Sequence, residues 1–175
     1  MRNVGLLVSR GIFGSYLVVH GAQKLFGSFG GHGLDATGAA FESMGLRPGK
    51  AMAAVAGASE LGGGLLTATG VADPLGPLAI AGTMAVASAV HRKQGPLAQN
   101  GGFELPLTNL ALAMGLLSTG AGRWRLGPRL PRGLTAVSAL VGTVMAAFSI
   151  SQLLGAKPSP PVASKPEGAT VEPSS

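Results

Sequence analysis

The sequence contains no cysteine, and only 11% of its 175 residues are charged. Without cysteine, the chain itself cannot form a disulfide, a thiolate metal site, a cysteine-ligated iron–sulfur cluster or a thiol relay. Soluble domains carry about 25% charged residues, so this chain has too few to cover a surface exposed to water. Aromatic residues make up only 5%, and no aromatic-interleaved basic pattern accompanies the formal charge of +6, so no nucleic-acid partner is expected.

Hydrophobic and small residues dominate what is present. Hydrophobic residues account for 46% of the chain, and glycine occupies 29 positions. Aliphatic blocks separated by glycine suit helices that pack closely in lipid. The composition therefore predicts an all-α fold class, a polytopic membrane helical bundle whose partner is the lipid bilayer.

The first apolar segment, residues 4–26, carries three basic side chains although it is long enough to cross a bilayer. At 100° per residue, Arg10, His20 and Lys24 lie on one side of the helix together with two glycines. A charge near the membrane centre costs about 2.5–3.5 kcal/mol, so these side chains must face protein and acidic partners. Arg10 also interrupts the apolar run, which favours a retained span over a cleaved signal peptide.

Four further apolar segments predict four further spans, over residues 51–71, 75–91, 105–121 and 134–154. A short interfacial helix is expected near residues 35–44, with a flexible loop as the alternative. Residues 122–133 hold four arginines and the only tryptophan, a composition typical of a membrane surface. We therefore predict a four-helix core over residues 1–126, the arginine-rich loop and an extra helix over 127–154, and a disordered Pro/Ser-rich tail over 155–175.

The polar residues of the predicted spans have similar predicted depths, close to one side of the membrane. Glu60 lies in the second span, and at ~1.5 Å rise per residue its depth allows pairing with either Arg10 or His20. Other polar side chains fall near the same boundary. We predict a polar pocket floored by Glu60, with the ligand candidates Arg10, His20, Lys24, Glu60, His91, Asn100 and Glu104.

These residues also have purely structural interpretations. One alternative is that Arg10 and Glu60 form a buried ion pair that only fixes helix register. Another is that His20 is a hydrogen-bonded packing residue and that Lys24 extends to the membrane boundary. No helix carries metal ligands at positions i and i+4, so no metal or haem site is predicted.

Three short motifs occur in a specific order along the chain. They are HGAQKLFG at residues 20–27, ELGGG at 60–64 and NGGFE at 100–104, and Gly122-Arg123-Trp124 follows them. Together they resemble the DoxX family of small bacterial membrane proteins over residues 4–126. The resemblance implies a four-helix transmembrane core in the bacterial inner membrane, and it does not extend to the fifth helix or the tail.

The resemblance also implies a role in redox chemistry. Related proteins resemble the membrane subunits of thiosulfate:quinone oxidoreduction, so Glu60, His20 and Lys24 would contact a quinone headgroup or a partner oxidoreductase. Because the chain has no cysteine to carry sulfur, any redox centre must come from that partner, and the chain is not expected to be catalytic alone. Small-solute transport and a non-catalytic membrane scaffold are the alternatives.

The basic residues near the span ends predict the orientation. The dense arginines of residues 122–133 favour the cytoplasmic side for that loop and for the N-terminus. The pocket opening and the C-terminal tail would then lie on the opposite side of the membrane.

Overall fold

Residues 1–155 are described by a computed structural model, and within them α-helices and short 3₁₀ turns occur without any β-strand. The helices are α1 (Arg2–Phe26), α2 (Gly33–Ser43), α3 (Gly49–Thr69), α4 (Leu75–His91), α5 (Glu104–Thr119) and α6 (Arg132–Gly155). The 3₁₀ turns are η1 (Ser28–Gly30), η2 (Arg92–Gln94) and η3 (Ala98–Asn100). The predicted all-α membrane helical bundle is confirmed, whereas residues 156–175 of the predicted tail lie outside the described part.

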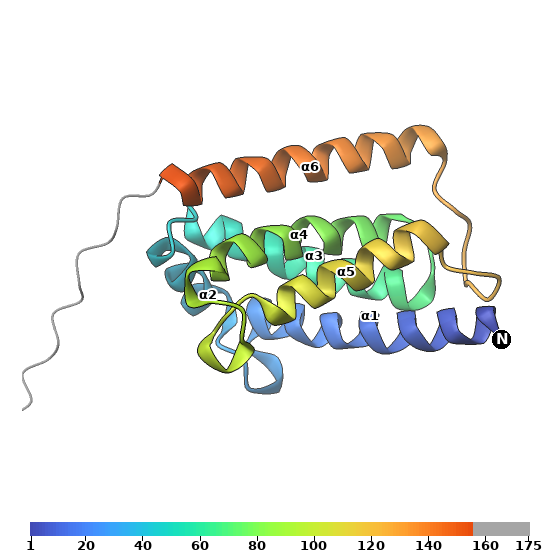
Figure 1. The fold of residues 1–175 in the computed structure, drawn as a ribbon, viewed down its shortest axis with the longest axis horizontal. Coiled ribbons are helices and arrows are strands. Elements are labelled where there is room, and N and C mark those ends of the chain that lie inside the picture. Colours follow the sequence, from blue (N-terminus) through green and yellow to red (C-terminus); the bar gives the residue numbers. More distant parts are fainter. Residues whose placement is uncertain (156–175) are drawn as a thin grey trace, which may run out of the picture.

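The five longer helices run side by side along one axis, with α2 at one end of the bundle (Figure 1). Of these, α1, α3 and α6 are long and apolar enough to cross a membrane. The helices α4 and α5 have 17 and 16 residues, somewhat fewer than the about 20 that a span needs. All five predicted spans are therefore present as helices, and α4 packs against α3, α5 and α6.

Glycine sets several helix ends and one helix contact. The helices α1 and α3 stop at Gly27 and Gly70, each with φ 71°, a left-handed conformation that glycine adopts without strain. The short helix predicted near residues 35–44 is present as α2. It packs closely on α3, because a Cβ at Gly38 would lie 2.8 Å from the Cα of Lys50.

The contact between α1 and α3 depends on small residues. A Cβ at Gly14 would lie 2.5 Å from the backbone oxygen of Gly64, and a Cβ at Gly64 would lie 2.6 Å from the backbone oxygen of Gly14. Gly21 makes an equally close approach to Gly57 and Leu61 further along the pair. The glycine face predicted for the first helix therefore faces α3, since only backbones without side chains can approach this closely.

A compact apolar core fills the space between α1, α4 and α5. Its buried side chains are Phe13, Leu17, Ile80, Met84, Ala113 and Leu116. The helix α1 therefore buries its glycines against α3 and its larger side chains against this core.

The arginine-rich connection, which we call the strap (residues 120–131), lies over the turn between α3 and α4 without forming a helix. Backbone hydrogen bonds join it to that turn, from Leu126 N to Thr69 O at 3.0 Å, from Ala72 N to Pro128 O at 3.1 Å and from Leu130 N to Asp73 O at 2.8 Å. The guanidinium of Arg10 also donates to the backbone oxygen of Trp124. The strap is therefore tied to the bundle along its length.

The last helix, α6, is tied to the bundle at both ends. The strap leads into its first turn, and near its last turn the side chain of Gln152 makes two hydrogen bonds of 2.8 Å with the backbone of Arg47. Between these attachments α6 packs against α4, and only Ser149 and Leu153 are buried. Most of α6 is therefore available to lipid, as its neutral sequence indicates.

Candidate functional site

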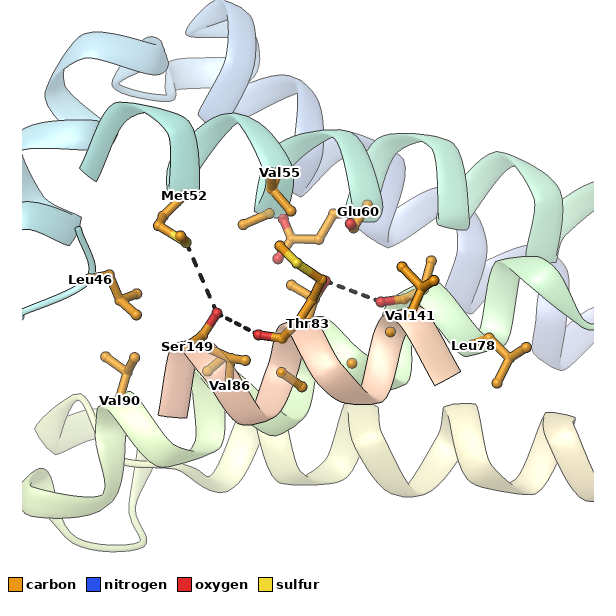
Figure 2. Close-up of a pocket in the computed structure, with 18 of the residues that line it drawn as sticks. Leu46, Met52, Val55, Glu60, Leu78, Thr83, Val86, Val90, Val141 and Ser149 are labelled. Atoms are coloured by element: carbon orange, nitrogen blue, oxygen red, sulfur yellow. Dashed lines mark hydrogen bonds between the residues drawn. The ribbon is translucent and has the colours of Figure 1, made fainter. Parts of the chain in front are cut away.

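A pocket of about 550 Å³ lies between α3, α4 and α6 (Figure 2). Phe41 of α2 and the Met44 and Leu46 side chains of the following loop also line it. The walls are mostly aliphatic side chains and methionines, including Met52, Val55, Leu78, Val86, Val141 and Met145. The pocket is therefore an apolar space in which any polar side chain has a strong influence on what can bind.

The strongest polar feature of the pocket is an ion pair between Lys24 and Glu60. The Lys24 Nζ lies 2.5 Å from Glu60 Oε2, and the Glu60 side chain is only 5% exposed. Glu60 lies in the middle of α3, whereas Lys24 lies in the last turn of α1. The pair places a buried carboxylate and its compensating ammonium at the wall of an apolar space.

A glycine makes this pairing sterically feasible. Gly57 lies one turn before Glu60 on α3, and a Cβ there would lie 2.7 Å from Leu25 Cγ and 3.3 Å from Lys24 Cβ. Without a side chain at Gly57, the end of α1 approaches α3 closely enough for the flexible lysine stem to reach the carboxylate. The close contact between the last turn of α1 and the Gly57–Glu60 turn of α3 therefore allows the ion pair to form.

The prediction that Glu60 pairs with Arg10 or His20 is wrong. Gly14 lies opposite Gly64, and Arg10 contacts the backbone position of Gly70. Because Gly70 follows Glu60 by ten residues, Arg10 is ~15 Å away from Glu60 along the bundle at 1.5 Å per residue. The prediction estimated the depth of each residue from the predicted ends of its span. The glycine contacts instead set how far α3 is shifted along α1, and this shift separates Arg10 from Glu60.

Arg10 lies under the strap rather than in the pocket. It is 2% exposed, and its only hydrogen bond within residues 1–155 goes to the backbone oxygen of Trp124. Its Nε and Nη1 atoms are buried without a hydrogen-bond partner in the described part of the chain. Arg10 is therefore a buried cation at the end of the bundle that the strap covers.

His20 has a packing role in the structure. Its ring meets the ring of Tyr16 edge to face, with 4.4 Å between ring centroids, and it does not line the pocket. This contact agrees with the packing part of the structural alternative, but His20 makes no side-chain hydrogen bond within residues 1–155. The depth of His20 matches that of Glu60, but its side chain leaves α1 in another direction.

The remaining candidates belong to the connection between α4 and α5. His91 lines the pocket, and its Nδ1 lies 2.7 Å from the backbone oxygen of Gly101. Glu104 accepts a 2.9 Å hydrogen bond from the backbone N–H of Ala98, and Asn100 ends η3. Of the seven candidates, Lys24, Glu60 and His91 line the pocket, whereas Arg10, His20, Asn100 and Glu104 do not.

The family assignment rests on residues that include this ion pair. The DoxX family model matches residues 5–92. The chain belongs to the DoxX family. The match covers α1 to α4 and so contains all three pocket candidates, Lys24, Glu60 and His91. A search of curated proteins and a search of solved structures each found no match to this chain.

The DoxX match ends before two features of the structure, of which one lines the pocket. The α6 wall and the strap both follow residue 92. The α5 region with its NGGFE motif also lies beyond the match, so the four-helix core over residues 1–126 stays a prediction of the resemblance. The α6 wall is therefore the part of the pocket that the DoxX family assignment does not account for.

Sequence reasoning missed the contribution of α6 to the pocket. The helix carries no charge after Arg132, so its sequence offers no ionisable residue that would place it at a site. One signal was available, since Ser138, Gly142, Ala146 and Ser149 recur at intervals of three and four residues and all line the pocket. A stripe of small residues at helical spacing indicates a face that approaches a neighbour.

Of the four hydroxyl groups that line the pocket, those of Thr83 and Ser149 are engaged as donors, whereas those of Ser59 and Ser138 make no hydrogen bond within residues 1–155. Thr83 donates to Ala79 O at 3.1 Å, and Ser149 donates to Met145 O at 2.9 Å (Figure 2). Within residues 1–155, no three His, Asp or Glu side chains lie close enough together to hold a metal ion. The ionisable side chains Lys24, Glu60 and His91, together with the hydroxyl groups of Ser59 and Ser138, are therefore the polar groups that remain to select a ligand.

Proposed function

We propose that this DoxX protein is a membrane accessory subunit of a redox system whose pocket holds the headgroup of a quinone-type lipid. The observation that carries the proposal is the Lys24–Glu60 pair at the wall of a 550 Å³ apolar pocket. Apolar walls suit the ring and isoprenoid tail of such a lipid, and a few polar groups suit its oxygens. A bound quinone would supply two-electron, two-proton redox chemistry that the chain's own residues lack.

The polar groups of the pocket fit both redox forms of such a headgroup. The Lys24 ammonium has three N–H donors, of which one is used by Glu60 Oε2, so it can donate to a carbonyl oxygen. Glu60 Oε1 makes no hydrogen bond within residues 1–155 and can accept from a hydroxyl group. His91 donates through Nδ1 to the Gly101 carbonyl, which leaves Nε2 as an acceptor. These three side chains would hold and orient the headgroup.

The proposal includes a partner, because the chain has no cysteine and no recognisable redox centre. In this proposal a membrane-associated oxidoreductase supplies the electrons, and the DoxX bundle holds the lipid substrate close to it. Five long helices that lie side by side support a multi-pass membrane protein (Figure 1), and the DoxX resemblance supports the bacterial inner membrane. The arginines of the strap support a cytoplasmic N-terminus.

Binding of a short-chain quinone to the full chain in neutral detergent tests the proposal. The variant Lys24→Gln/Glu60→Gln keeps two hydrogen-bonding side chains but removes both charges from the pocket. We expect about ten-fold weaker binding or more, because hydrogen bonds to charged groups contribute about 1.5–3 kcal/mol. The matched control is Asp35→Asn/Lys50→Gln, which removes an exposed pair (2.6 Å) near the same end but outside the pocket.

Equal affinity in wild type, pocket variant and control would contradict the proposal. Flux of a small solute through proteoliposomes that is abolished by Glu60→Gln would favour transport instead. Purification of the chain without quinone and without any oxidoreductase, from cells that contain both, would favour a scaffold.

A further inference from the structure

One end of the bundle is strongly basic, and we call it the arginine end. It consists of the start of α1, the turn between α3 and α4, and the strap with the first residue of α6. Its basic residues are Arg2, Arg10, Arg123, Arg125, Arg129 and Arg132. Within residues 1–155, the acidic residue at this end is Asp73, which is 5% exposed and whose Oδ2 lies 3.5 Å from Arg129 Nε. Most of the positive charge at this end is therefore not neutralised by the described part of the chain.

Several of these guanidinium groups are free to bind a ligand. The side chains of Arg2, Arg123 and Arg132 are exposed and make no hydrogen bond or ion pair within residues 1–155. Arg125 donates only to backbone oxygens of the strap, those of Gly122 and Gly127. These donors face solvent or headgroups rather than acids of the bundle.

The strap holds these arginines on a fixed backbone. Its three hydrogen bonds to the α3–α4 turn and the Arg10 contact with Trp124 O fix its middle. The side chain of Asn3 accepts a 3.3 Å hydrogen bond from the backbone N–H of Arg123, which places Arg123 beside the start of α1 and so near Arg2. Because the backbone is already ordered, binding costs less conformational entropy than it would in a free loop.

Apolar side chains are exposed among the arginines. Trp124 is 52% exposed and Leu126 is 82% exposed. Tryptophan and neighbouring apolar groups are typical of the boundary between lipid and water. Beneath them lies the buried cation of Arg10, whose Nε and Nη1 atoms have no partner in the described residues. The surface therefore combines positive charge with exposed apolar groups of the kind found at a membrane boundary.

We propose that the arginine end binds the phosphate of an anionic phospholipid headgroup. Guanidinium groups bind phosphate oxygens through paired N–H donors, so free arginines suit this ligand. The exposed Trp124 and Leu126 select a phospholipid over free phosphate, because they contact the glycerol and acyl region beside the headgroup. This site is separate from the pocket, and it would anchor and orient the bundle in a leaflet that contains anionic lipid.

Fluorescence of Trp124 tests this proposal directly, because it is the only tryptophan in the chain. The full chain in neutral detergent is titrated with bromine-labelled phosphatidylglycerol or bromine-labelled phosphatidylcholine, which quench tryptophan on contact. We expect half-maximal quenching at a clearly lower mole fraction of phosphatidylglycerol. In Arg123→Gln/Arg132→Gln this preference should fall about five-fold for each arginine removed, the change that corresponds to about 1 kcal/mol per basic residue at an anionic surface.

The matched control is Arg92→Gln/Lys93→Gln, which removes two exposed basic residues at the opposite end of the bundle. It should leave the preference at Trp124 unchanged. Equal quenching by both lipids, or an equal loss in both variants, would overturn the proposal. Inorganic phosphate at the concentration of the labelled lipid should not prevent quenching, and full competition by phosphate would show a general anion site instead.

Discussion

The two ends of the bundle use their charges in different ways. At the end that carries α2, three basic residues pair with carboxylates, Lys24 with Glu60, Arg47 with Glu42 and Lys50 with Asp35, whereas Arg92 and Lys93 are exposed without an ion pair within residues 1–155. At the arginine end, Asp73 contacts Arg129, and the free arginines project outward. Charges that are paired internally shape a pocket and a fold, whereas charges without an internal partner are available to a membrane or a ligand.

The largest effect is expected when a substitution breaks the buried ion pair at the α2 end. Lys24→Met leaves the Glu60 carboxylate buried without its partner, which costs about 3–5 kcal/mol when one member of a buried pair is removed. Thermal unfolding in detergent should show a strongly lowered midpoint. Lys24→Met/Glu60→Leu should recover most of the loss, because it removes the unpaired charge as well. Equal midpoints for the single and the double variant would show that pairing does not set the stability here.

The next effect concerns the α1–α3 contact that connects the two ends. In Gly14→Ala, the new Cβ lies 2.5 Å from Gly64 O and 2.7 Å from Ala68 N, so backbones must move apart. We expect a loss of about 1–3 kcal/mol from overpacking, measured by chemical unfolding. Gly11→Ala is the matched control on the same helix, because a Cβ there has nothing within 4 Å, and alanine should slightly stabilise α1.

An effect of at most the same size is expected where α6 is attached beside the pocket. Gln152→Ala removes both hydrogen bonds to the Arg47 backbone, at about 0.5–1.5 kcal/mol each. Hydrogen exchange should rise in the last turns of α6 but not in the strap at the opposite end. Gln94→Ala, which removes an exposed glutamine of η2, is the control. A uniform rise along α6 would mean that the helix is not held separately at its two ends.

The smallest effect sharpens the contrast between buried and exposed pairs. Lys50→Gln breaks the Asp35 pair, whose side chains are 67% and 86% exposed. Exposed pairs contribute about 0–1 kcal/mol, so the unfolding midpoint should change little. If Lys50→Gln lowered the unfolding midpoint as much as Lys24→Met does, burial would not be what makes the Lys24–Glu60 pair important for stability.

Hydropathy and glycine spacing were sufficient to predict the helices and the face of α1 that meets α3. They follow from local properties of the chain, namely apolar run length and helical periodicity. The DoxX motifs likewise predicted the family, and the match over residues 5–92 confirms it. The helices, the glycine face of α1 and the family motifs are all determined by residues that lie close together in the sequence.

The site could be predicted only in part, because it depends on register and direction. Glu60 was recognised as a buried acid, but its partner depends on how far α3 is shifted along α1, which Gly57 and Gly64 determine through contacts. The α6 wall carries no charge, so only its stripe of small residues indicates which face approaches a neighbour, and it does not say which neighbour. The strap depends on backbone hydrogen bonds between distant residues, which sequence patterns do not encode.

Photolabelling with an azido-quinone tests the central claim most directly, because it maps contacts on the wild-type chain. After illumination and digestion, we expect label on α3 near Met52–Glu60 and on α6 near Val137–Ser149, which form facing walls of the pocket. Excess unlabelled quinone should prevent this labelling, and Lys24→Gln/Glu60→Gln should reduce it. Label spread over the lipid-facing surfaces of α1 and α5, unchanged in that variant, would contradict the assignment of the pocket as the ligand site.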